Sequence, residues 1–303
     1  MWRRDKTGTV VSPADVVTQA PLSGDTLSVP AAGSFGPIIK AEKVAFGYTQ
    51  DKLVLRDISF EVSAGEVLMI LGSNGCGKST LMRLLLNDKQ TAGGRILLDG
   101  TELRELSPLE ISRRVAMVFQ DHNAPFPYDV IDVVAMGRTP YLSAFATPRA
   151  RDMRICEDAL ESVGMMHLAH KPYTQISGGE RQMVLIARAL AQETPLIMMD
   201  EPTSHLDYRN AAIVIQTANR LASEQNKAVV MVTHLPDQAF YYPSKAALME
   251  HGRFFAFGPS REVLTEANLT RTYSMQIKVL TAVDEMTGQE HIMCKPVPES
   301  IRP

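Results

Sequence analysis

The stretch Gly72-Ser-Asn-Gly-Cys-Gly-Lys-Ser79 decides the fold of this chain. It fits the pattern G-x-x-x-x-G-K-[ST], which forms a phosphate-binding loop when an apolar strand precedes it and a helix follows it. Both flanks are present, because Val67–Leu71 is an uninterrupted apolar run and Ser79–Leu86 has the character of a helix. The sequence therefore predicts a buried strand, a phosphate loop and a helix in succession.

Each part of this segment has a chemical reason. Glycines let the backbone curl so that N–H groups point at phosphate oxygens, and the helix N-terminus adds the positive end of its dipole. Lys78 supplies a charge for the β- and γ-phosphates, and the Ser79 hydroxyl is a ligand for Mg²⁺. Cys76 is interpreted as a filler whose side chain points away, with a redox role as the alternative. The residues expected to contact nucleotide here are Gly72, Ser73, Asn74, Gly75, Cys76, Gly77, Lys78, Ser79 and Thr80.

A pair of adjacent acids supplies the second half of the predicted site. Asp200 and Glu201 end the apolar strand Leu196–Met199, and strand alternation sends their side chains in different directions. Asp200 is expected to hold Mg²⁺, and Glu201 to polarise the attacking water as a general base. Acids that merely cap a strand are the alternative, but a phosphate loop requires a metal partner, which favours the site.

The composition limits the class of protein. The 303 residues are 45% hydrophobic and 21% charged, which is ordinary for a globular protein and excludes wholesale disorder. Lys and Arg number 31 and Asp and Glu 34, so the net charge of −3 disfavours binding of nucleic acid through overall charge. The cysteines, Cys76, Cys156 and Cys294, are too few for a disulfide framework and fit a reducing, cytoplasmic compartment.

No segment has the pattern of a membrane span or a secretion signal. No apolar run approaches the roughly 18 residues that a membrane-spanning helix needs. The charged N-terminus is not followed by an apolar stretch, so no signal peptide is expected. A role at a membrane is therefore expected to come through a partner.

Three regions differ in composition along the chain. Residues 1–37 are rich in Pro, Gly, Ser and Thr, so a disordered extension is expected, with a docking arm as the alternative. Residues 38–265 alternate strand-like and helix-like segments, which is typical of an α/β fold with a mainly parallel sheet. Within them, Ile38–Phe46 and Val54–Val62 alternate apolar and polar residues, as antiparallel strands do. Residues 266–303 are expected to form a C-terminal extension with a β-hairpin.

The segment Ile176-Ser-Gly-Gly-Glu180 resembles the signature motif of the ATPase subunits of ABC transporters, usually Leu-Ser-Gly-Gly-Gln. Ile176 and Glu180 depart from that pattern, but its Ser-Gly-Gly centre is intact. A second phosphate cradle is expected here, at the start of a helix. Its residues are Ser177, Gly178, Gly179 and Glu180. The resemblance implies a P-loop NTPase fold with an antiparallel β subdomain and an inserted helical subdomain. It also implies ATP and Mg²⁺ as cofactors, bound between the two subunits of a head-to-tail homodimer.

The same resemblance gives roles to four further positions. Tyr48 matches the aromatic that stacks on adenine, the alternative being a surface aromatic on a hairpin turn. Gln120 matches the glutamine that joins the metal and water site to the transmembrane partner, so it is expected to be a third Mg²⁺ ligand beside Ser79 and Asp200. Asp207 belongs to a segment that crosses the dimer interface, and His234 matches the histidine that contacts the γ-phosphate and positions water. A structural histidine at a strand end is the alternative for His234, and His205 is interpreted as incidental.

Residues 121–176 are expected to form the helical subdomain that meets the membrane partner. Gly137-Arg-Thr-Pro140 and the stretch Phe257–Leu264 resemble importers of iron-siderophore, haem and cobalamin complexes. The resemblance implies a transport ATPase at the cytoplasmic face of the cell membrane. It would be held there by permease subunits and served indirectly by a substrate-binding protein, with no nucleic-acid partner.

Other classes of function share part of this sequence pattern. An ABC ATPase acting on DNA or ribosomes is disfavoured by the single cassette, the absence of a coiled coil and the negative charge. A P-loop kinase or GTPase is disfavoured by Ser177–Gly179 and His234. Another cargo, a metal or an oxyanion, or export, stays open. The pairs His167 with His170 and His291 with Cys294 each provide two ligands, too few for a Zn²⁺ site.

Overall fold

The structure is a computed structural model that describes residues 36–49, 52–119, 127–143, 146–204, 206–242, 244–286, 288 and 290–297. Of the predicted N-terminal extension, only Gly36 and Pro37 are among these residues. Gln120 and His205 also lie outside the described residues. The chain divides into residues 1–33 and 34–303, and the elements below all belong to the second unit.

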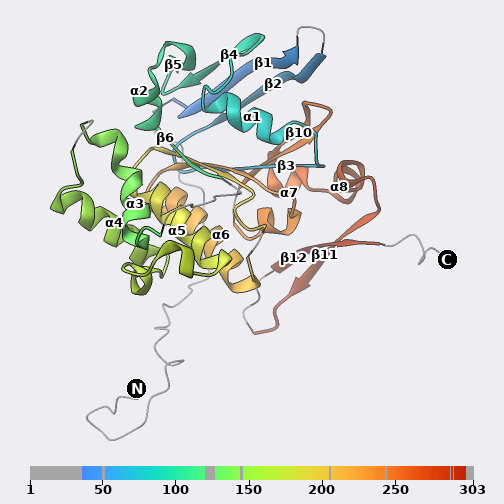
Figure 1. The fold of residues 1–303 in the computed structure, drawn as a ribbon. Coiled ribbons are helices and arrows are strands. Elements are labelled where there is room, and N and C mark those ends of the chain that lie inside the picture. Colours follow the sequence, from blue (N-terminus) through green and yellow to red (C-terminus); the bar gives the residue numbers. More distant parts are fainter. Residues whose placement is uncertain are drawn as a thin grey trace, which may run out of the picture. The chain divides into compact units, whose positions relative to one another are not determined.

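A six-stranded sheet forms the centre of this unit (Figure 1). In sheet order its strands are β10 (Arg253–Pro259), β9 (Lys245–Glu250), β3 (Val67–Gly72), β8 (Ala228–Val232), β7 (Leu196–Asp200) and β6 (Val115–Val118). Only β10 runs antiparallel to its neighbour. The middle strands are apolar runs because helices and the second sheet cover both faces. The predicted α/β fold with a mainly parallel sheet is confirmed.

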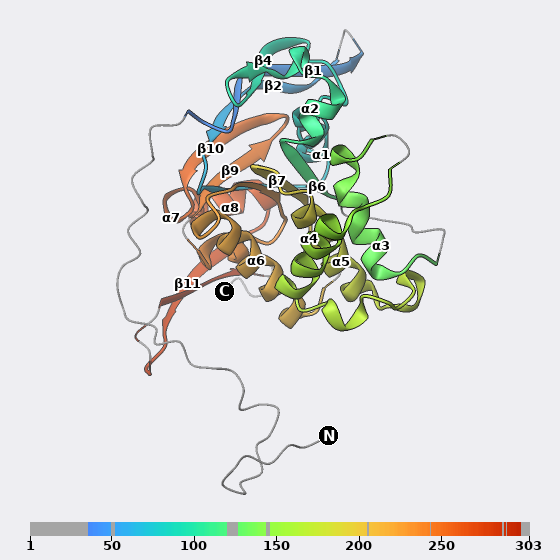
Figure 2. The same ribbon diagram turned by 90° about the vertical axis from the view of Figure 1, so that its left-hand side faces the viewer.

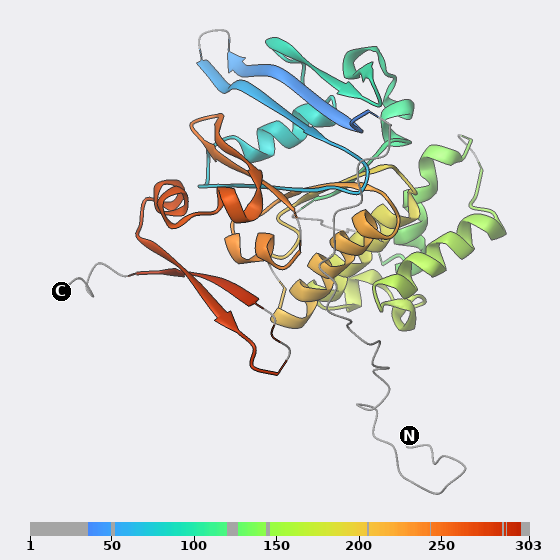
Figure 3. The ribbon, with the colours of Figure 1, turned by 180° about the vertical axis from the view of Figure 1, so that it is seen from behind.

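A second, antiparallel sheet lies against one face of the first. Its order is β2 (Lys52–Val62), β1 (Ile39–Thr49), β4 (Gly93–Leu98) and β5 (Thr101–Glu102). Helix α1 (Lys78–Leu85) is seen between the two sheets in opposite views (Figures 1 and 3). The alternating burial of β1 and β2 reflects one face toward this core and one toward solvent. The short helices η1 (Leu103–Glu105) and α2 (Pro108–Ser112) follow β5.

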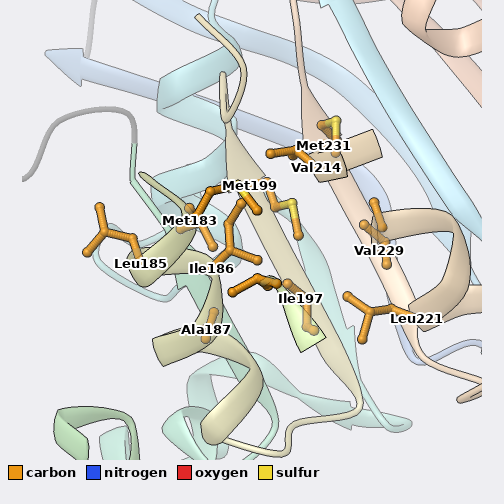
Figure 4. Close-up of a cluster of buried hydrophobic side chains, with 14 of the residues drawn as sticks. Met183, Leu185, Ile186, Ala187, Ile197, Met199, Val214, Leu221, Val229 and Met231 are labelled. Carbon is orange, nitrogen blue, oxygen red and sulfur yellow. The ribbon is translucent and has the colours of Figure 1, made fainter. Parts of the chain in front are cut away.

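Strand β3 separates two hydrophobic cores, because its side chains alternate between the two faces of the sheet. Leu68 and Ile70 pack with α1 and the antiparallel sheet. Val67, Met69 and Leu71 face the other core, built with α5 (Gly178–Ala191) and α6 (Tyr208–Ser223). Figure 4 shows side chains of α5, α6, β7 and β8 meeting in this second core. The phosphate loop thus extends from a strand buried on both sides.

Helices α3 and α4 pack beside α5 (Figure 2). The elements of this part are α3 (Val130–Ala135), η2 (Met136–Tyr141), α4 (Ala150–Ser162), η3 (Met166–Leu168) and η4 (Tyr173–Gln175). These elements lie within the range 121–176 that the sequence assigns to a helical subdomain.

The motif Gly137-Arg-Thr-Pro140 ties this helical part to the end of α5. A Cβ atom at Gly137 would lie 2.3 Å from the backbone oxygen of Arg188, so only glycine allows this approach. Arg138 is 5% exposed and donates to Asp152 Oδ1 at 3.1 Å and to Glu193 Oε2 at 2.8 Å. The same guanidinium donates to the Ala191 carbonyl at 2.7 Å. The motif therefore has a structural explanation in this chain.

The C-terminal part adds two short helices and a strand pair. Its elements are η5 (Pro236–Phe240), α7 (Ser260–Val263), α8 (Glu266–Tyr273), β11 (Ile277–Val283) and β12 (Glu290–Pro296). β11 and β12 pair antiparallel, from Ile277 opposite Pro296 to Val283 opposite Glu290. Over the described residues, no helix is both long enough and apolar enough to span a membrane.

Candidate nucleotide site

The phosphate loop connects the end of β3 to the start of α1. Gly75 and Gly77 have φ values of 79° and 116°, which other residues rarely adopt, so the curl of the loop depends on glycine. Lys78 is only 6% exposed, and its Nζ donates to the carbonyls of Gly72 at 2.7 Å and Ser73 at 3.1 Å. These contacts hold the ammonium group against the loop, where the sequence predicts the phosphates.

Cys76 packs inside the loop rather than projecting from it. A Cβ atom at Gly72 would lie 2.7 Å from Cys76 Sγ and 2.5 Å from the Met249 carbonyl oxygen. Burial raises the pKa of the Cys76 thiol, which keeps it protonated and weakly nucleophilic. The geometry fits a filler better than a redox group.

Asp200 and Ser79 provide neighbouring oxygen atoms beside the loop. The Ser79 hydroxyl hydrogen-bonds to the Asp200 carboxylate. Burial, and then the adjacent charge of Glu201, raise the pKa of Asp200. Asp200 is a half-buried carboxylate next to a second acid, and hard oxygen donors are what Mg²⁺ prefers. The donor set therefore fits Mg²⁺.

The third predicted metal ligand, Gln120, lies outside the described residues. No group of three or more His, Cys, Asp or Glu residues suited to a metal occurs in the described part of the chain. Mg²⁺ commonly keeps waters and substrate phosphates in such sites, so two protein oxygens suffice. The histidine and cysteine pairs noted in the sequence remain without further ligands among the described residues.

Glu201 and His234 come together at the ends of neighbouring strands. Glu201 follows β7 with φ 46°, in the left-handed region, and its backbone N–H donates to the Val232 carbonyl of β8 at 3.0 Å. His234 lies two residues beyond β8, and its Nδ1 is 3.3 Å from Glu201 Oε2. The two residues predicted to act on water are therefore adjacent.

A buried amide joins the two loops that carry these residues. Gln238 Nε2 donates to Thr203 Oγ1 at 2.8 Å, and Thr233 Oγ1 donates to Gln238 Oε1 at 2.9 Å. Thr233 Oγ1 also accepts from the backbone N–H of Leu235 at 3.1 Å. Sequence reasoning missed Gln238, because one polar residue in Pro236–Phe240 carries no signal that it is buried.

Tyr48 lies at the surface beside the start of α1. It is 58% exposed, its hydroxyl is 3.3 Å from Thr80 Oγ1, and its ring packs edge-on against Phe46. The ring is thus held near the phosphate loop and is largely exposed, which leaves it accessible for stacking on a base.

The signature segment caps helix α5. Ser177 is the N-cap, and the Glu180 N–H donates to Ser177 Oγ at 3.3 Å. In return, the Ser177 N–H donates to Glu180 Oε2 at 2.7 Å, and this bond contributes most to the lowered pKa of Glu180. Serine and glutamate form a capping box here, which gives Glu180 a local structural task. Gly178 has open space around its Cβ position.

Asp207 is also a helix cap. Its Oδ1 accepts from the Asn210 N–H at 2.8 Å at the start of α6. The next residue, Tyr208, is 93% exposed. The segment predicted to cross a dimer interface, which ends at Asp207, is therefore followed directly by an exposed aromatic side chain.

Comparison with known proteins identifies the family. The family model described as ABC transporter matches residues 55–204. A molybdate import ATP-binding protein of Haemophilus influenzae is 37% identical over 237 residues, which cover 78% of this chain and 88% of that protein. The chain belongs to the ABC transporter family. A hemin import ATP-binding protein of Nocardia farcinica is 40% identical to this ABC protein over 228 residues, covering 75% and 78% of the two chains.

A solved structure matches this ABC ATP-binding protein over most of its length. It is described as an inward-facing metal-chelate type ABC transporter, and its TM-score is 0.78 at 34% identity. The match covers 88% of this chain and 100% of the other. The predicted ABC-type ATPase fold is confirmed, and this ABC protein is an ATP-hydrolysing enzyme rather than a P-loop kinase or GTPase.

Proposed function

We propose that this ABC ATPase drives the import of a chelated metal, such as an iron-siderophore, haem or cobalamin complex. The observation that carries the proposal is the metal-chelate type transporter, which matches across its full length. The hemin import relative supports the same cargo class. Cobalamin rests on the sequence resemblance alone.

An oxyanion is the second candidate cargo. It is favoured by the molybdate import relative, which matches a similar share of this chain. The ATPase subunit does not touch the cargo in either case, so its own residues discriminate weakly between them.

The described residues suggest how hydrolysis proceeds. The loop amides and Lys78 bind the phosphates of ATP, while Tyr48 stacks on adenine. Ser79 and Asp200 would hold Mg²⁺, and the ion would neutralise charge on the phosphates of ATP. Glu201 accepts a proton from the water that attacks the γ-phosphate in line. His234, whose Nδ1 lies 3.3 Å from Glu201 Oε2, orients that water.

The proposed assembly has three kinds of partner. Two copies sandwich two ATP molecules, with the Ser177–Gly179 cradle and Asp207 of one copy facing the nucleotide of the other. Gln120 and the helical subdomain contact permease subunits at the cytoplasmic face of the membrane, and a substrate-binding protein delivers the cargo to the permease. Closing and reopening of the dimer then moves the permease.

The enzymatic part is tested by ATPase assays on the purified chain and its complex. Lys78→Ala removes the buried charge, and Glu201→Gln removes the base while keeping its shape. Each is expected to lower hydrolysis by about a hundredfold or more. ATP binding should fall in Lys78→Ala and persist in Glu201→Gln. The exposed Lys89→Ala and Glu224→Gln serve as matched controls. Wild-type turnover in Lys78→Ala or Glu201→Gln contradicts the assigned roles.

The cargo is tested on the membrane complex. The tagged chain is purified from native membranes in mild detergent, its permease is identified by mass spectrometry, and the complex is placed in liposomes. Haem, a ferric siderophore, cobalamin and molybdate are then compared for ATP-dependent uptake. Uptake of a chelate supports the proposal; uptake of molybdate alone supports the second candidate. A permease with about ten membrane spans per subunit is expected for the chelate class.

A further inference from the structure

The C-terminal extension, here α8, β11 and β12, contacts the loop that carries His234. Tyr273, the last residue of α8, donates its hydroxyl to the backbone carbonyl of His234 at 3.0 Å. Its ring is half-buried and packs against the core between the sheet and helices. Burial raises the pKa of Tyr273, so its hydroxyl remains a donor across the physiological range.

A second contact reaches the same loop from β12. The backbone N–H of Cys294 donates to Asp237 Oδ1 at 2.5 Å, and β12 packs along η5. Two elements of the extension therefore hold residues 234–237 from one side. On the other side, Gln238 connects this loop to Thr203 in the loop that follows Glu201.

The extension makes contacts both with the ATPase domain and between its own elements. Arg271 of α8 forms an ion pair with Glu250 of β9 at 2.6 Å. Glu266 at the start of α8 accepts from Lys278 Nζ at 2.9 Å and from the Val279 N–H at 3.0 Å, both on β11. Figure 1 shows α8 beside the β9–β10 edge of the sheet and the strand pair beyond it. These contacts fix the position of α8, and therefore of Tyr273, relative to the loop that carries His234.

We infer that Tyr273 is a positioning residue for His234, so that the C-terminal extension sets the rate of ATP hydrolysis. The His234 imidazole reaches Glu201 at 3.3 Å, while the backbone carbonyl of the same residue is held by Tyr273 at 3.0 Å. Loss of the hydroxyl removes the hydrogen bond that holds the backbone carbonyl of His234. The inference rests on the role proposed for His234 in hydrolysis.

Tyr273→Phe removes only the hydroxyl and keeps the packed ring. We expect kcat for ATP hydrolysis to fall by about fivefold, the scale of one hydrogen bond, with the KM for ATP unchanged. The KM is spared because Tyr273 does not contact the phosphate loop in the described hydrogen bonds. Hydrogen exchange should quicken in residues 233–240 and not in the phosphate loop.

Asp237→Ala provides a second route to the same loop. It removes the acceptor of the Cys294 N–H and should lower kcat and quicken exchange in the same segment, again without changing the KM. This variant matters because it removes the hydrogen bond between the loop and β12 without altering Tyr273.

Thr270→Val is the matched control. Thr270 Oγ1 accepts from the Ile277 N–H at 3.1 Å, so this change also removes one hydrogen bond of the extension, but not one to the His234 loop. It should leave kcat and the KM near wild type. Equal losses of kcat in Tyr273→Phe and Thr270→Val, or an unchanged kcat in Tyr273→Phe, would overturn the inference. The proposed function is tested separately, because it would be contradicted by wild-type ATPase turnover in Lys78→Ala or Glu201→Gln.

Discussion

At the scale of one residue, the environment of Asp200 disfavours the charged carboxylate that metal binding would need. Asp200 is a half-buried acid beside a second acid, and its hydrogen bond to Ser79 only partly offsets that environment. The pKa of Asp200 is higher in the folded chain than in the unfolded chain, so folding favours the protonated form. This contribution to stability is present at low pH and is lost as the pH rises through the folded pKa.

Asp200→Asn is therefore expected to stabilise the nucleotide-free protein at neutral pH while abolishing hydrolysis. The melting temperature should rise by about 2 °C at pH 7.5 without Mg²⁺, and the difference from wild type should shrink as the pH falls and the wild-type carboxyl becomes protonated. Calorimetry over this pH range measures it, with the exposed Asp158→Asn as control. A lower melting temperature than wild type at pH 7.5 would contradict the assigned charge repulsion.

At the scale of elements, one buried arginine joins the helical part to α5. Arg138 donates to two acids and to a carbonyl at the end of α5, and it lies 4.3 Å over the Tyr141 ring. Helix α5 begins at the signature serine, Ser177. Arg138 thus fixes the helices that are proposed to meet the permease to the helix that carries the signature.

Arg138→Ala is expected to lower the melting temperature by about 5–10 °C, because Asp152 and the Ala191 carbonyl each lose a hydrogen bond from a buried charged group. Arg138→Lys keeps the charge but cannot reproduce all three hydrogen bonds. Its melting temperature should therefore lie between those of the wild type and Arg138→Ala. Arg113→Ala is the matched control, since Arg113 is exposed and stacks 5.7 Å from the same Tyr141 ring. Similar losses for Arg113→Ala and Arg138→Ala would show that the buried contacts contribute little.

At the scale of the whole molecule, the two phosphate cradles lie on different parts of one chain. The phosphate loop joins β3 to α1, whereas the signature begins α5, which packs against α3 and α4. The proposed homodimer brings the loop of one copy to the signature of the other. Each complete site then needs one half from each chain.

Mixing two inactive variants tests this arrangement. Lys78→Ala removes the lysine of the phosphate loop. Gly178→Asp places a negative charge in the Ser177–Gly179 cradle, at a position with open space for a Cβ atom. Each variant alone should be inactive, whereas an equal mixture should recover about a quarter of wild-type ATPase activity, because half the dimers contain one intact site. Gly178→Ala, which adds no charge, should stay active. A mixture as inactive as its components would contradict the head-to-tail dimer.

Local features could be predicted from the sequence by itself. The phosphate loop, the strand before it and the helix after it depend on glycines, an apolar run and a lysine that are contiguous in the chain. The cap at Ser177 is local as well, and its reciprocal partner Glu180, which the signature predicts to contact nucleotide, also forms half of a capping box. Backbone preference and short-range hydrogen bonds determine such features, so adjacent residues suffice.

Contacts between distant segments were decided only by the tertiary structure. Glu201 meets His234 because β7 and β8 are parallel neighbours, and strand order is set by the packing of the whole sheet. Gln238 with Thr203, and Tyr273 with His234, join residues that are 35 and 39 positions apart. A single hydroxyl or amide carries no pattern in sequence that names its partner. The chain's own sequence thus determined which chemistry is present, and folding determined which residues hold that chemistry in place.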